Sequence, residues 1–241
     1  MKISVIVPAF NEEKLIGSTL QSIKAAASAW DAIGWTYEII VCNNNSTDRT
    51  AELAAAQGAT VVFEPINQIS RARNTGTRHA TGDWVLFIDA DSQPSAPLFA
   101  EFAKAIQGGE CLGGGSTVKL EHGYPVGQFI TSAWNLLSRL TKWAPGSFIF
   151  SERASFLKIG GFSEKLFVAE ELELSQRLKS YAKQQGKRLI ILHRHPLLTS
   201  ARKMHLYSRS EHLRFLARTI LRIGRPLRNR DECFVWYDGR R

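Results

Sequence analysis

Apolar residues in the N-terminal part of the chain follow two alternating patterns, short continuous runs and longer segments with helical spacing. A nearly continuous apolar run is typical of a strand that is buried on both faces of a parallel sheet. Such runs cover residues 3–8, 37–42, 60–63 and 84–88. Between them, apolar residues recur three or four positions apart, as in Ile16, Leu20 and Ile23, and predict helices. The alternation predicts an α/β fold with a doubly wound, mostly parallel sheet.

Capping residues suggest where two of these helices begin. Asn11 precedes Glu12 and Glu13, whose charges suit a first helical turn, so we expect Asn11 to cap the first helix. We expect Ser70 to cap the helix that contains Arg73.

The second half of the chain is less regular. Its patterns predict helices over 97–106, 125–140 and 170–181, and strands over 115–120, 146–150 and 188–192. The glycines at 113–115 weaken a strand but allow close approach of the backbone to a ligand. We expect one domain over residues 1–200, with one half at 1–95 and a smaller half at 96–200. A basic amphipathic tail would cover 201–241.

Two carboxylates directly follow the apolar run at 84–88. Asp89 and Asp91 are separated by one residue, and Gln93 continues the spacing. Ligands of open α/β sheets bind beyond the carboxyl ends of the strands. Both carboxylates can therefore reach one hard cation such as Mg²⁺ or Mn²⁺, with Gln93 as an additional oxygen donor. The alternative is a solvated acidic turn, because an Asp-x-Asp pair alone is a weak signal.

The composition indicates an affinity for anions. Formal charge is +9, from 31 basic and 22 acidic residues, which favours nucleotide diphosphates, nucleic acid or an anionic membrane surface as partners. Cys42, Cys111 and Cys233 are few and far apart, so we expect no disulfide framework and a reducing, cytoplasmic setting. The longest apolar candidate for a membrane span, 129–150, is interrupted by Arg139 and Lys142.

Five separate stretches of the chain form a recognisable series. They are residues 5–12 (VIVPAFNE), 43–48 (NNNSTD), 71–76 (RARNTG), 82–91 (GDWVLFIDAD), and the set formed by 159–162 (IGGF), Glu170, Glu171 and Arg177. Together they resemble the inverting GT-A glycosyltransferases of family 2, and they occur in the order expected for that family, which makes the combined signal strong. On this resemblance, residues 1–95 would bind the nucleotide sugar and residues 96–200 the acceptor.

This resemblance implies a GT-A, Rossmann-like fold, a nucleotide-sugar donor such as a UDP- or GDP-sugar, a divalent Mn²⁺ or Mg²⁺ ion and inversion at the anomeric carbon. The acceptor would be a sugar or a lipid-linked or polyprenyl-phosphate molecule. The implied donor-binding residues are Pro8, Ala9, Phe10, Glu12, Asn43, Asn44, Arg73, Asp89 and Ala90. The implied metal ligands are Asp91, Asp89 and Gln93, and the implied catalytic base is Glu171, with Glu170 as the alternative.

The sequence departs from the family pattern at two places. Asn43 or Asn44 would face the base where the family more often has Asp; an Asn accepts from a uracil N3–H but can also donate, which weakens uracil recognition. Glu171 stands where the family's base is normally Asp, and the extra methylene shifts the carboxylate. The Gln-x-x-Arg-Trp signature of processive polymerases in the family is absent.

Late histidines and basic residues are further candidates for the site. His205 is the stronger candidate for an additional metal ligand, whereas His193 and His195 are better explained as hydrogen-bonded histidines at a strand end. Arg202 and Lys203 either clamp the departing diphosphate or form a solvated basic turn. Trp134 and Trp143 fit an acceptor platform or, with more support, the core beside a helix.

The C-terminal tail combines an apolar helical face with a basic ridge. Leucine and isoleucine recur at threes, fours and sevens, and arginines recur every fourth residue. This pattern predicts either an interfacial helix on an anionic membrane or a helix packed on the domain. The apolar set is Leu206, Leu213, Leu216, Ile220 and Ile223, and the basic set is Arg214, Arg218 and Arg222.

Two other functions remain as alternatives. A nucleic-acid- or anion-binding protein would explain the positive charge. However, the sequence has no nucleic-acid motif, and such a protein does not need the paired aspartates. We therefore expect no nucleic-acid partner. A nucleotidyltransferase of similar architecture would need a glycine-rich, basic loop after the first strand. The acidic sequence at residues 11–13 has the wrong charge for that loop.

Overall fold

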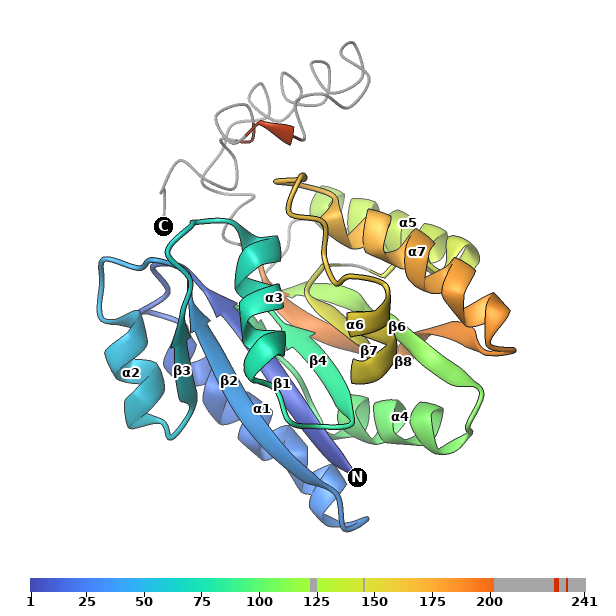
Figure 1. The fold of residues 1–241 in the computed structure, drawn as a ribbon, viewed down its shortest axis with the longest axis horizontal. Helices are drawn as coiled ribbons and strands as arrows, with labels where there is room; N and C mark the ends of the chain where they lie inside the picture. The colour runs from blue at the N-terminus through green and yellow to red at the C-terminus, as the bar shows by residue number, and fades with distance from the viewer. Residues whose placement is uncertain (122–124, 145, 202–227, 230–232, 234–241) are drawn as a thin grey trace.

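One sheet organises the chain in this computed structural model, which describes residues 1–121, 125–144, 146–201, 228–229 and 233. Its eight strands lie in the order β3-β2-β1-β4-β7-β6-β8-β5 (Figure 1). The strands β1 to β4 are mutually parallel, β7 is antiparallel to both β4 and β6, and β8 is parallel to β6. The strands are β1 (Lys2–Ala9), β2 (Thr36–Asn43), β3 (Thr60–Phe63), β4 (Trp84–Ile88), β5 (Ser92–Gln93), β6 (Cys111–Glu121), β7 (Phe148–Glu152) and β8 (Arg188–Ser200).

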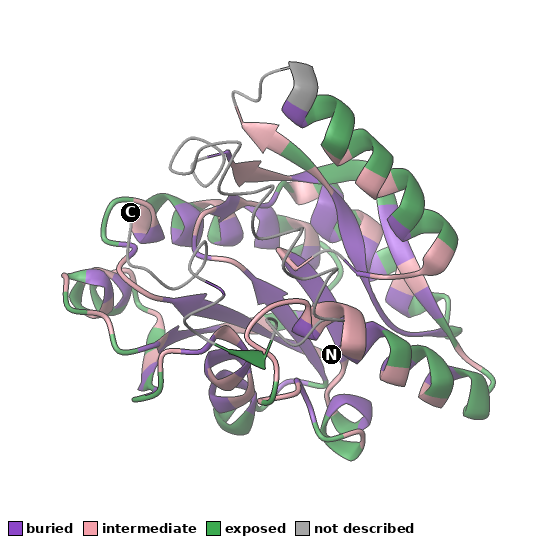
Figure 2. Cartoon of the chain, turned by 90° about the horizontal axis from the view of Figure 1, so that it is seen from above, coloured by how far each residue is buried: buried purple, intermediate pink, exposed green. Residues whose placement is uncertain are grey.

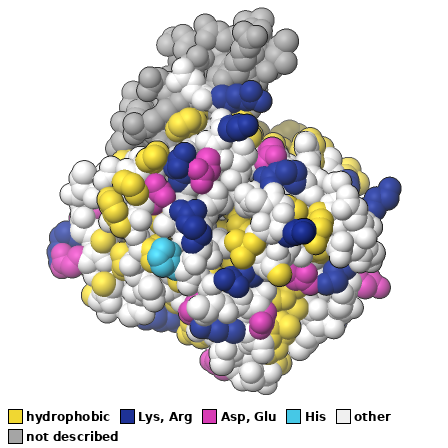
Figure 3. Space-filling model, in the orientation of Figure 1, with side chains coloured by type: hydrophobic (Ala, Val, Ile, Leu, Met, Phe, Trp, Pro, Cys, Tyr) yellow, Lys and Arg dark blue, Asp and Glu magenta, His cyan; other side chains and the backbone are white. Residues whose placement is uncertain are grey.

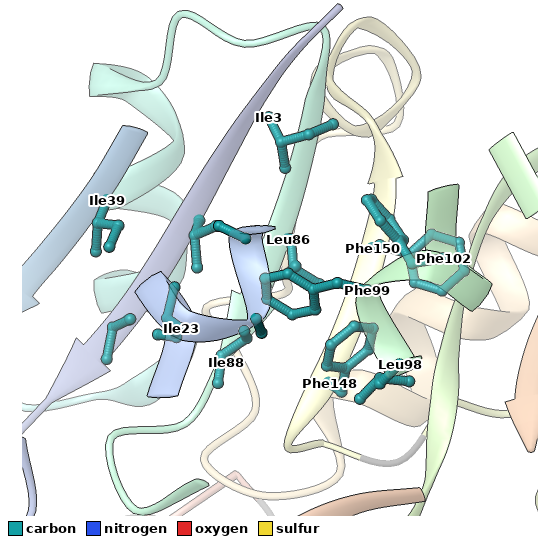
Figure 4. Packing of buried hydrophobic residues seen from close by; sticks show 14 of the residues in the cluster. Ile3, Ile23, Ile39, Leu86, Ile88, Leu98, Phe99, Phe102, Phe148 and Phe150 are labelled. Atoms are coloured by element: carbon teal, nitrogen blue, oxygen red, sulfur yellow. The ribbon is translucent and has the colours of Figure 1, made fainter. Parts of the chain in front are cut away.

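Helices cover both faces of the sheet because successive residues of a buried strand point to opposite sides. On one side, Val5, Leu86 and Phe150 pack with apolar residues of α1 (Ile16–Asp31) and α4 (Ala96–Gln107), as Figure 4 shows for part of this core. On the other side of the sheet, Ile6 and Phe87 pack with apolar residues of three helices. Those helices are α3 (Ile69–His79), α6 (Arg153–Lys158) and α7 (Glu170–Gln184).

The sequence predicted the first half closely. The parallel order of β1 to β4 is confirmed, with α1, α2 (Thr50–Ala56) and α3 between the strands. Both predicted caps are wrong. Asn11 has a left-handed φ of 52°, and α1 begins only at Ile16. Residue Gln68 precedes α3, so Ser70 lies inside that helix.

The glycine run at 113–115 is part of β6, where it permits close approach of neighbouring strands. A Cβ atom on Gly114 would lie 1.8 Å from the carbonyl oxygen of Ile190 in β8, and one on Gly113 would lie 2.7 Å from that of Phe150 in β7. The expectation that these glycines make room for a ligand is therefore wrong, because other strands fill that space.

The last strand is longer than predicted because it passes through an irregularity. Ser116 of β6 pairs with Leu192, but the next paired residue, Val118, faces Leu197. The carboxylate of Glu101, from α4, accepts hydrogen bonds from the backbone N–H groups of His193, Arg194 and His195 in the intervening segment. This acceptor replaces the sheet partners that the irregular segment lacks, so β8 continues to Ser200.

The sheet runs continuously through both predicted halves of the domain, since β4 pairs directly with β7. The helix predicted at 125–140 is observed as α5 (Pro125–Thr141), which packs beside β6. Among the residues that the structure describes, none forms a helix with the length and hydropathy that a membrane crossing requires. The predicted tail falls outside the described residues, except for 201, 228–229 and 233.

Candidate functional site

The candidate site lies at the carboxyl ends of β1, β2 and β4. Asp89 directly follows β4, and its backbone N–H donates to the carbonyl oxygen of Ser147 at 3.4 Å. The carbonyl oxygen of Asp91 accepts from the backbone N–H of Ser200 at 3.1 Å, so the end of β8 returns to this point. Asp91 and Gln93 are half-buried. The structure thus brings the end of the described domain to the paired aspartates.

The loops that follow β1 and β2 are joined by hydrogen bonds. Asn11 accepts from the backbone N–H of Thr47 at 2.8 Å and donates its own N–H to the Ser46 hydroxyl at 3.0 Å. The backbone N–H of Glu12 donates to the Thr50 hydroxyl at 2.7 Å. These bonds explain the left-handed backbone of Asn11, which links the two loops instead of capping a helix. Beside them, Pro8 and Ala9 are buried and Phe10 is half-buried.

The two asparagines at the end of β2, Asn43 and Asn44, have different hydrogen-bond partners. Asn43 accepts from the backbone N–H of Ser46 at 2.9 Å and stabilises the turn. Asn44 is 3% exposed, and its side-chain amide donates to the carbonyl oxygens of Glu64 at 3.3 Å and Ile66 at 2.6 Å. Because these carbonyls take both amide hydrogens, only the Oδ1 acceptor of Asn44 remains. The expectation that this Asn can also donate to a base is therefore wrong.

Arg73 connects Asp89, which follows β4, with Glu170 at the start of α7. Its guanidinium donates to Asp89 at 2.9 Å, to Glu170 at 2.8 Å and to the carbonyl oxygen of Gly146 at 2.8 Å. A Cβ atom on Gly146 would lie 3.7 Å from the carboxylate of Glu171, so Glu171 borders the same space. We call Arg73, Asp89, Gly146, Glu170 and Glu171 the Arg73 cluster.

Arg73 and Glu170 are deeply buried at the centre of the Arg73 cluster, which perturbs its ionisable groups. Arg73 is 1% exposed; burial opposes its charge, but the combined attraction of Asp89, Glu170 and Glu171 outweighs burial and raises its pKa. Burial, followed by repulsion from Glu171, raises the pKa of Glu170. Burial also raises the pKa of Glu171. Three carboxylates facing one guanidinium therefore favour retention of a proton on the Glu170–Glu171 pair.

Glu170 and Glu171 occupy the first turn of α7, although they differ in exposure. The preceding Ala169 has a left-handed φ of 64°, a conformation that is costly for a residue with a Cβ atom. The Glu170 side chain is buried against Arg73, whereas Glu171 is half-buried. Glu171 is thus the more accessible of the two candidate bases, and Glu170 is placed to hold Arg73.

Helix α3 is also hydrogen-bonded to the glycine-rich turn at 159–162. The Asn74 side chain donates to the carbonyl oxygen of Phe162 at 3.0 Å and accepts from its N–H at 2.9 Å. The Phe162 ring in turn lies against Arg73, with the guanidinium carbon 5.0 Å from the ring centroid. From α7, Arg177 donates to the carbonyl oxygens of Ile159 and Gly161. Stretches far apart in sequence therefore meet around Arg73.

The donor atoms near Asp91 fit a hard divalent cation. Asp89, Asp91 and Gln93 offer oxygen ligands, and sites for Mg²⁺ or Mn²⁺ that also bind substrate phosphates need only one or two carboxylates. Within the described residues there is no group of three or more His, Cys, Asp or Glu side chains that could hold a metal ion. Arg202, Lys203 and His205 lie outside the described residues.

The remaining candidates have mainly local contacts. His193 contacts the carbonyl oxygen of Ile191, and His195 contacts the Glu101 carboxylate at 3.2 Å. Trp134 and Trp143 are half-buried. Cys42, Cys111 and Cys233 are buried thiols. Burial raises the pKa of Cys42 and of Cys111 to about 12.

Sequence reasoning missed two groups that shape the site. No sequence pattern indicates the role of the Gly146 carbonyl, because every residue carries a backbone carbonyl. Glu64 directly follows β3, and its carboxylate accepts from the Thr75 hydroxyl at 2.6 Å and from the backbone N–H of Ile66 at 3.0 Å. An acidic residue at the carboxyl end of a predicted strand was a usable signal for this second group.

Comparison with known proteins identifies the family. The sequence model of glycosyl transferase family 2 matches residues 4–145, which is more than half of the chain. A relative from Klebsiella pneumoniae, named an undecaprenyl-phosphate 4-deoxy-4-formamido-L-arabinose transferase, is 32% identical over 120 residues, covering 46% of this chain and 36% of its own length. The chain thus spans less than half the length of the curated relatives that it matches.

Solved structures show the same fold at low sequence identity. TarS from S. aureus in complex with UDP-GlcNAc has a TM-score of 0.67 and 20% identity, over 98% of this chain and 69% of the other. A mannosyltransferase from Pyrobaculum calidifontis in complex with GDP-Man and Mn²⁺ has a TM-score of 0.66 and 22% identity, over 90% and 60%. Together with the family match, this likeness in fold shows that the chain is a GT-A-fold member of glycosyl transferase family 2.

Proposed function

We propose that the chain is a metal-dependent inverting glycosyltransferase, which moves a sugar from a UDP- or GDP-sugar to a lipid-linked acceptor. The observation that carries this proposal is the Arg73 cluster. Through one buried guanidinium, it ties Asp89 of the Asp-x-Asp pair to Glu170 at the start of α7, the neighbour of Glu171. A transferase needs such a connection because donor and base must be held in register for direct displacement.

The acceptor-only character of Asn44 supports a uracil or guanine base in the donor. Uracil has a ring N3–H and guanine a ring N1–H, and either can donate to Asn44 Oδ1. The corresponding ring nitrogens of cytosine and adenine carry no hydrogen, so they would face a second acceptor. The bound donors of the two structural neighbours, UDP-GlcNAc and GDP-Man, contain these two favoured bases.

Asp89 and Asp91, with the Gln93 amide oxygen, would hold the Mn²⁺ or Mg²⁺ ion. When bound, such an ion supplies positive charge for the developing negative charge of the departing diphosphate. His205 and Arg202 extend this proposal beyond the described residues. The hydrogen bond between Ser200 and Asp91 supports their inclusion, because it brings the chain to the paired aspartates shortly before residue 202.

The acceptor side would provide the base. Glu171 takes the proton from an acceptor hydroxyl as its oxygen attacks the anomeric carbon from the face opposite the leaving diphosphate. The bond from that carbon to the diphosphate oxygen breaks, and the anomeric configuration inverts. Glu170 and Arg73 act as positioning residues. If the acceptor is a polyprenyl phosphate, its oxygen is already anionic and needs little help from a base.

A lipid-linked acceptor would place the enzyme on the cytoplasmic face of a membrane. The name of the Klebsiella relative includes undecaprenyl phosphate, and the predicted basic tail suits an anionic surface. Nucleic acid is a poorer partner for the face that carries α3, α6 and α7. Its Lys and Arg side chains are dispersed, with acidic side chains among them, instead of forming a continuous basic stripe (Figure 3).

A donor screen tests the proposal. We expect the protein to hydrolyse one UDP- or GDP-sugar slowly in the presence of Mn²⁺ or Mg²⁺, and to transfer its sugar when polyprenyl phosphate is added. Asp91→Asn should abolish both reactions and the Mn²⁺-dependent part of nucleotide binding measured by calorimetry. Asp31→Asn, an exposed carboxylate at the end of α1, is the matched control. Equally tight nucleotide binding without metal in wild type and in Asp91→Asn would contradict the proposal.

A further inference from the structure

Helix α5 exposes its apolar face. Phe129 is 75% exposed and Leu140 is 73% exposed, and three further large apolar side chains, Ile130, Leu136 and Leu137, are at least 40% exposed. Figure 2 shows exposed residues along much of α5, which lies at one end of the molecule. Leu136, Leu137 and Leu140 belong, with Trp134, to the apolar set that predicts this helix, but these three leucines do not contribute to the core.

The inward face of α5 includes several small and polar residues, beside the half-buried Trp134. Gly127 and Ser138 are buried, and Asn135 and Thr131 are partly buried. The Asn135 side chain accepts from the backbone N–H of Val118 in β6 at 3.0 Å and donates to its carbonyl oxygen at 2.8 Å. Hydrogen bonds therefore attach α5 to the sheet, and the outward apolar side chains are not required for that attachment.

The exposed apolar residues form one continuous stripe. Their spacing along α5 follows the helical period, so they share a single face. At a rise of about 1.5 Å per residue, the stripe is about 17 Å long. Single exposed leucines are ordinary on a protein surface, but a contiguous apolar face indicates an interaction site. We define the α5 stripe as Phe129, Ile130, Ala133, Leu136, Leu137 and Leu140.

Positive charge borders the α5 stripe. The sequence has no Asp or Glu between residues 121 and 152, whereas Arg139 and Lys142 lie at the C-terminal end of the helix. Lys179 of α7 donates to the carbonyl oxygen of Thr141 at 3.2 Å and adds a third cation there. A hollow between α5 and β8 combines Arg139 and Lys142 with apolar wall residues Leu136, Leu140 and Leu189.

Apolar side chains beside a group of cations match the boundary between acyl chains and anionic headgroups. A second copy of the chain is a poorer occupant, because residues 122–151 contain no Asp or Glu, so α5 of the other copy would offer Arg139 and Lys142 no acidic partner. The basic tail of this chain has the same disadvantage, since residues 202–230 contain nine Lys and Arg but only one acidic residue, Glu211.

We propose that the α5 stripe docks the protein onto an anionic lipid bilayer, with Arg139 and Lys142 at the level of the headgroup phosphates. The connection that follows α5 leads directly to Gly146, whose carbonyl oxygen accepts from Arg73. In a docked α5, Gly146 of the Arg73 cluster therefore follows the membrane-bound helix by five residues along the chain. This surface assignment goes beyond the proposed transfer reaction and does not depend on it.

Vesicle flotation of the full chain tests the assignment without any turnover. We expect wild-type protein to float with phosphatidylglycerol-rich vesicles and much less with pure phosphatidylcholine vesicles. The triple variant Phe129→Ser, Leu136→Ser, Leu140→Ser should lower the partition coefficient by about tenfold or more, since it removes the side chains that enter the bilayer. The control variant Ile33→Ser, Leu157→Ser changes two exposed apolar residues elsewhere, Ile33 after α1 and Leu157 on α6, and should bind vesicles as the wild type does.

Three other outcomes would count against the proposal. Undiminished flotation of the folded triple variant would assign binding to another part of the chain, such as the tail. Absence of wild-type flotation at low salt would rule out bilayer docking. A wild-type dimer in sedimentation that the triple variant dissociates, without vesicle binding, would assign the stripe to a second copy. Hydrolysis of the donor by the triple variant at the wild-type rate would separate a docking defect from a failure of the proposed chemistry.

A reporter variant gives a second measurement that does not remove apolar surface. In Leu140→Trp, added fluorescence should be quenched by vesicles of brominated phosphatidylglycerol, because the new ring lies in the acyl region. In Leu157→Trp, the added fluorescence should not change. Equal quenching of both reporters, or quenching of neither, would overturn the assignment of α5 as the docking element.

Discussion

The Arg73 cluster and the α5 stripe depart from the usual distribution of charge and hydrocarbon in opposite directions. The cluster buries a guanidinium and the carboxylate of Glu170, whereas the stripe leaves leucine, isoleucine and phenylalanine in contact with solvent. Taking a charged group out of water costs several kcal/mol even when it is paired, and an exposed large apolar side chain forgoes about 1.5–3 kcal/mol of transfer free energy. Neither arrangement is explained by stability alone, so both point to function.

The two regions also differ in how they are assembled. The cluster draws on α3, the end of β4, the loop before β7 and the start of α7, so each member depends on distant parts of the fold. The stripe belongs to one helix that is attached by polar contacts on its other face. Changes in the cluster should therefore destabilise the whole domain, whereas changes in the stripe should leave the domain folded.

The largest expected effect comes from breaking the buried charge cluster. Arg73→Met should lower the free energy of unfolding by about 3–5 kcal/mol, because it leaves Asp89 and Glu170 without their cation. Arg71→Met is a matched control on the same helix. Arg71 pairs with Glu164 at 2.8 Å, but both side chains are about one-third exposed, so the loss should be below about 1 kcal/mol.

Urea denaturation of the two variants measures this difference directly. Equal losses would mean that the buried pairs contribute no more than an ordinary surface pair. That result would contradict the view that Arg73 organises the site.

A second pair of variants compares a buried and an exposed phenylalanine. Phe102 of α4 is fully buried against Trp84, Phe148 and Phe150, so Phe102→Ala should cost about 3–5 kcal/mol. Phe129→Ala in α5 removes the same atoms from an exposed position and should change stability by no more than about 0.5 kcal/mol. Thermal and urea unfolding of both variants would test this. A large loss at Phe129 would show that the stripe is part of the folded core.

These two helices show what sequence pattern could and could not predict. In both α4 and α5 the helical period of apolar residues was recognised correctly, but the period identifies a face without saying whether that face meets the core. The buried strands were predicted well because continuous apolar runs have few alternatives in an α/β protein. Asp89 and Asp91 could be placed at a strand end for the same reason.

The contacts that define the site were harder to predict because they join distant segments. The motifs indicated that Arg73 and Glu170 belong to one site, but not that a direct ion pair joins them. The donor capacity of Asn44 was misjudged, since its carbonyl partners come from the loop after β3. Asn11 looked like a helix cap locally, yet a bond to Thr47 holds it in a left-handed turn.

A smaller effect should follow from loosening α5 at its polar attachment. Asn135→Ala removes two hydrogen bonds to Val118 and should cost about 1–2 kcal/mol, because the N–H and carbonyl groups of β6 lose their partner. Amide exchange at β6 should accelerate. Ser132→Ala, on the exposed side of α5, is the control and should change neither quantity. An unchanged exchange rate in Asn135→Ala would mean that other contacts hold the helix.

The smallest expected effect is a change in how stability depends on pH. Burial, and then mutual repulsion, raises the pKa of Glu170 in the folded chain above its ordinary value of 4.5, and burial raises that of Glu171. Above pH 4.5 the folded state therefore binds more protons than the unfolded state, so stability should fall as pH rises through the folded-state pKa. One retained proton limits this slope to about 1.4 kcal/mol per pH unit.

In Glu171→Gln, Glu170 faces one carboxylate fewer and can ionise beside Arg73 at lower pH, so the slope of stability against pH should flatten. Glu173→Gln, which alters a partly exposed pair with Arg177 in the same helical turn, controls for the loss of a negative charge. Denaturation series from pH 5 to pH 8 on the three proteins would measure the slopes. Parallel curves for wild type and Glu171→Gln would show that the pair holds no extra proton, and the buried cluster would then differ less from an ordinary set of ion pairs than its burial implies.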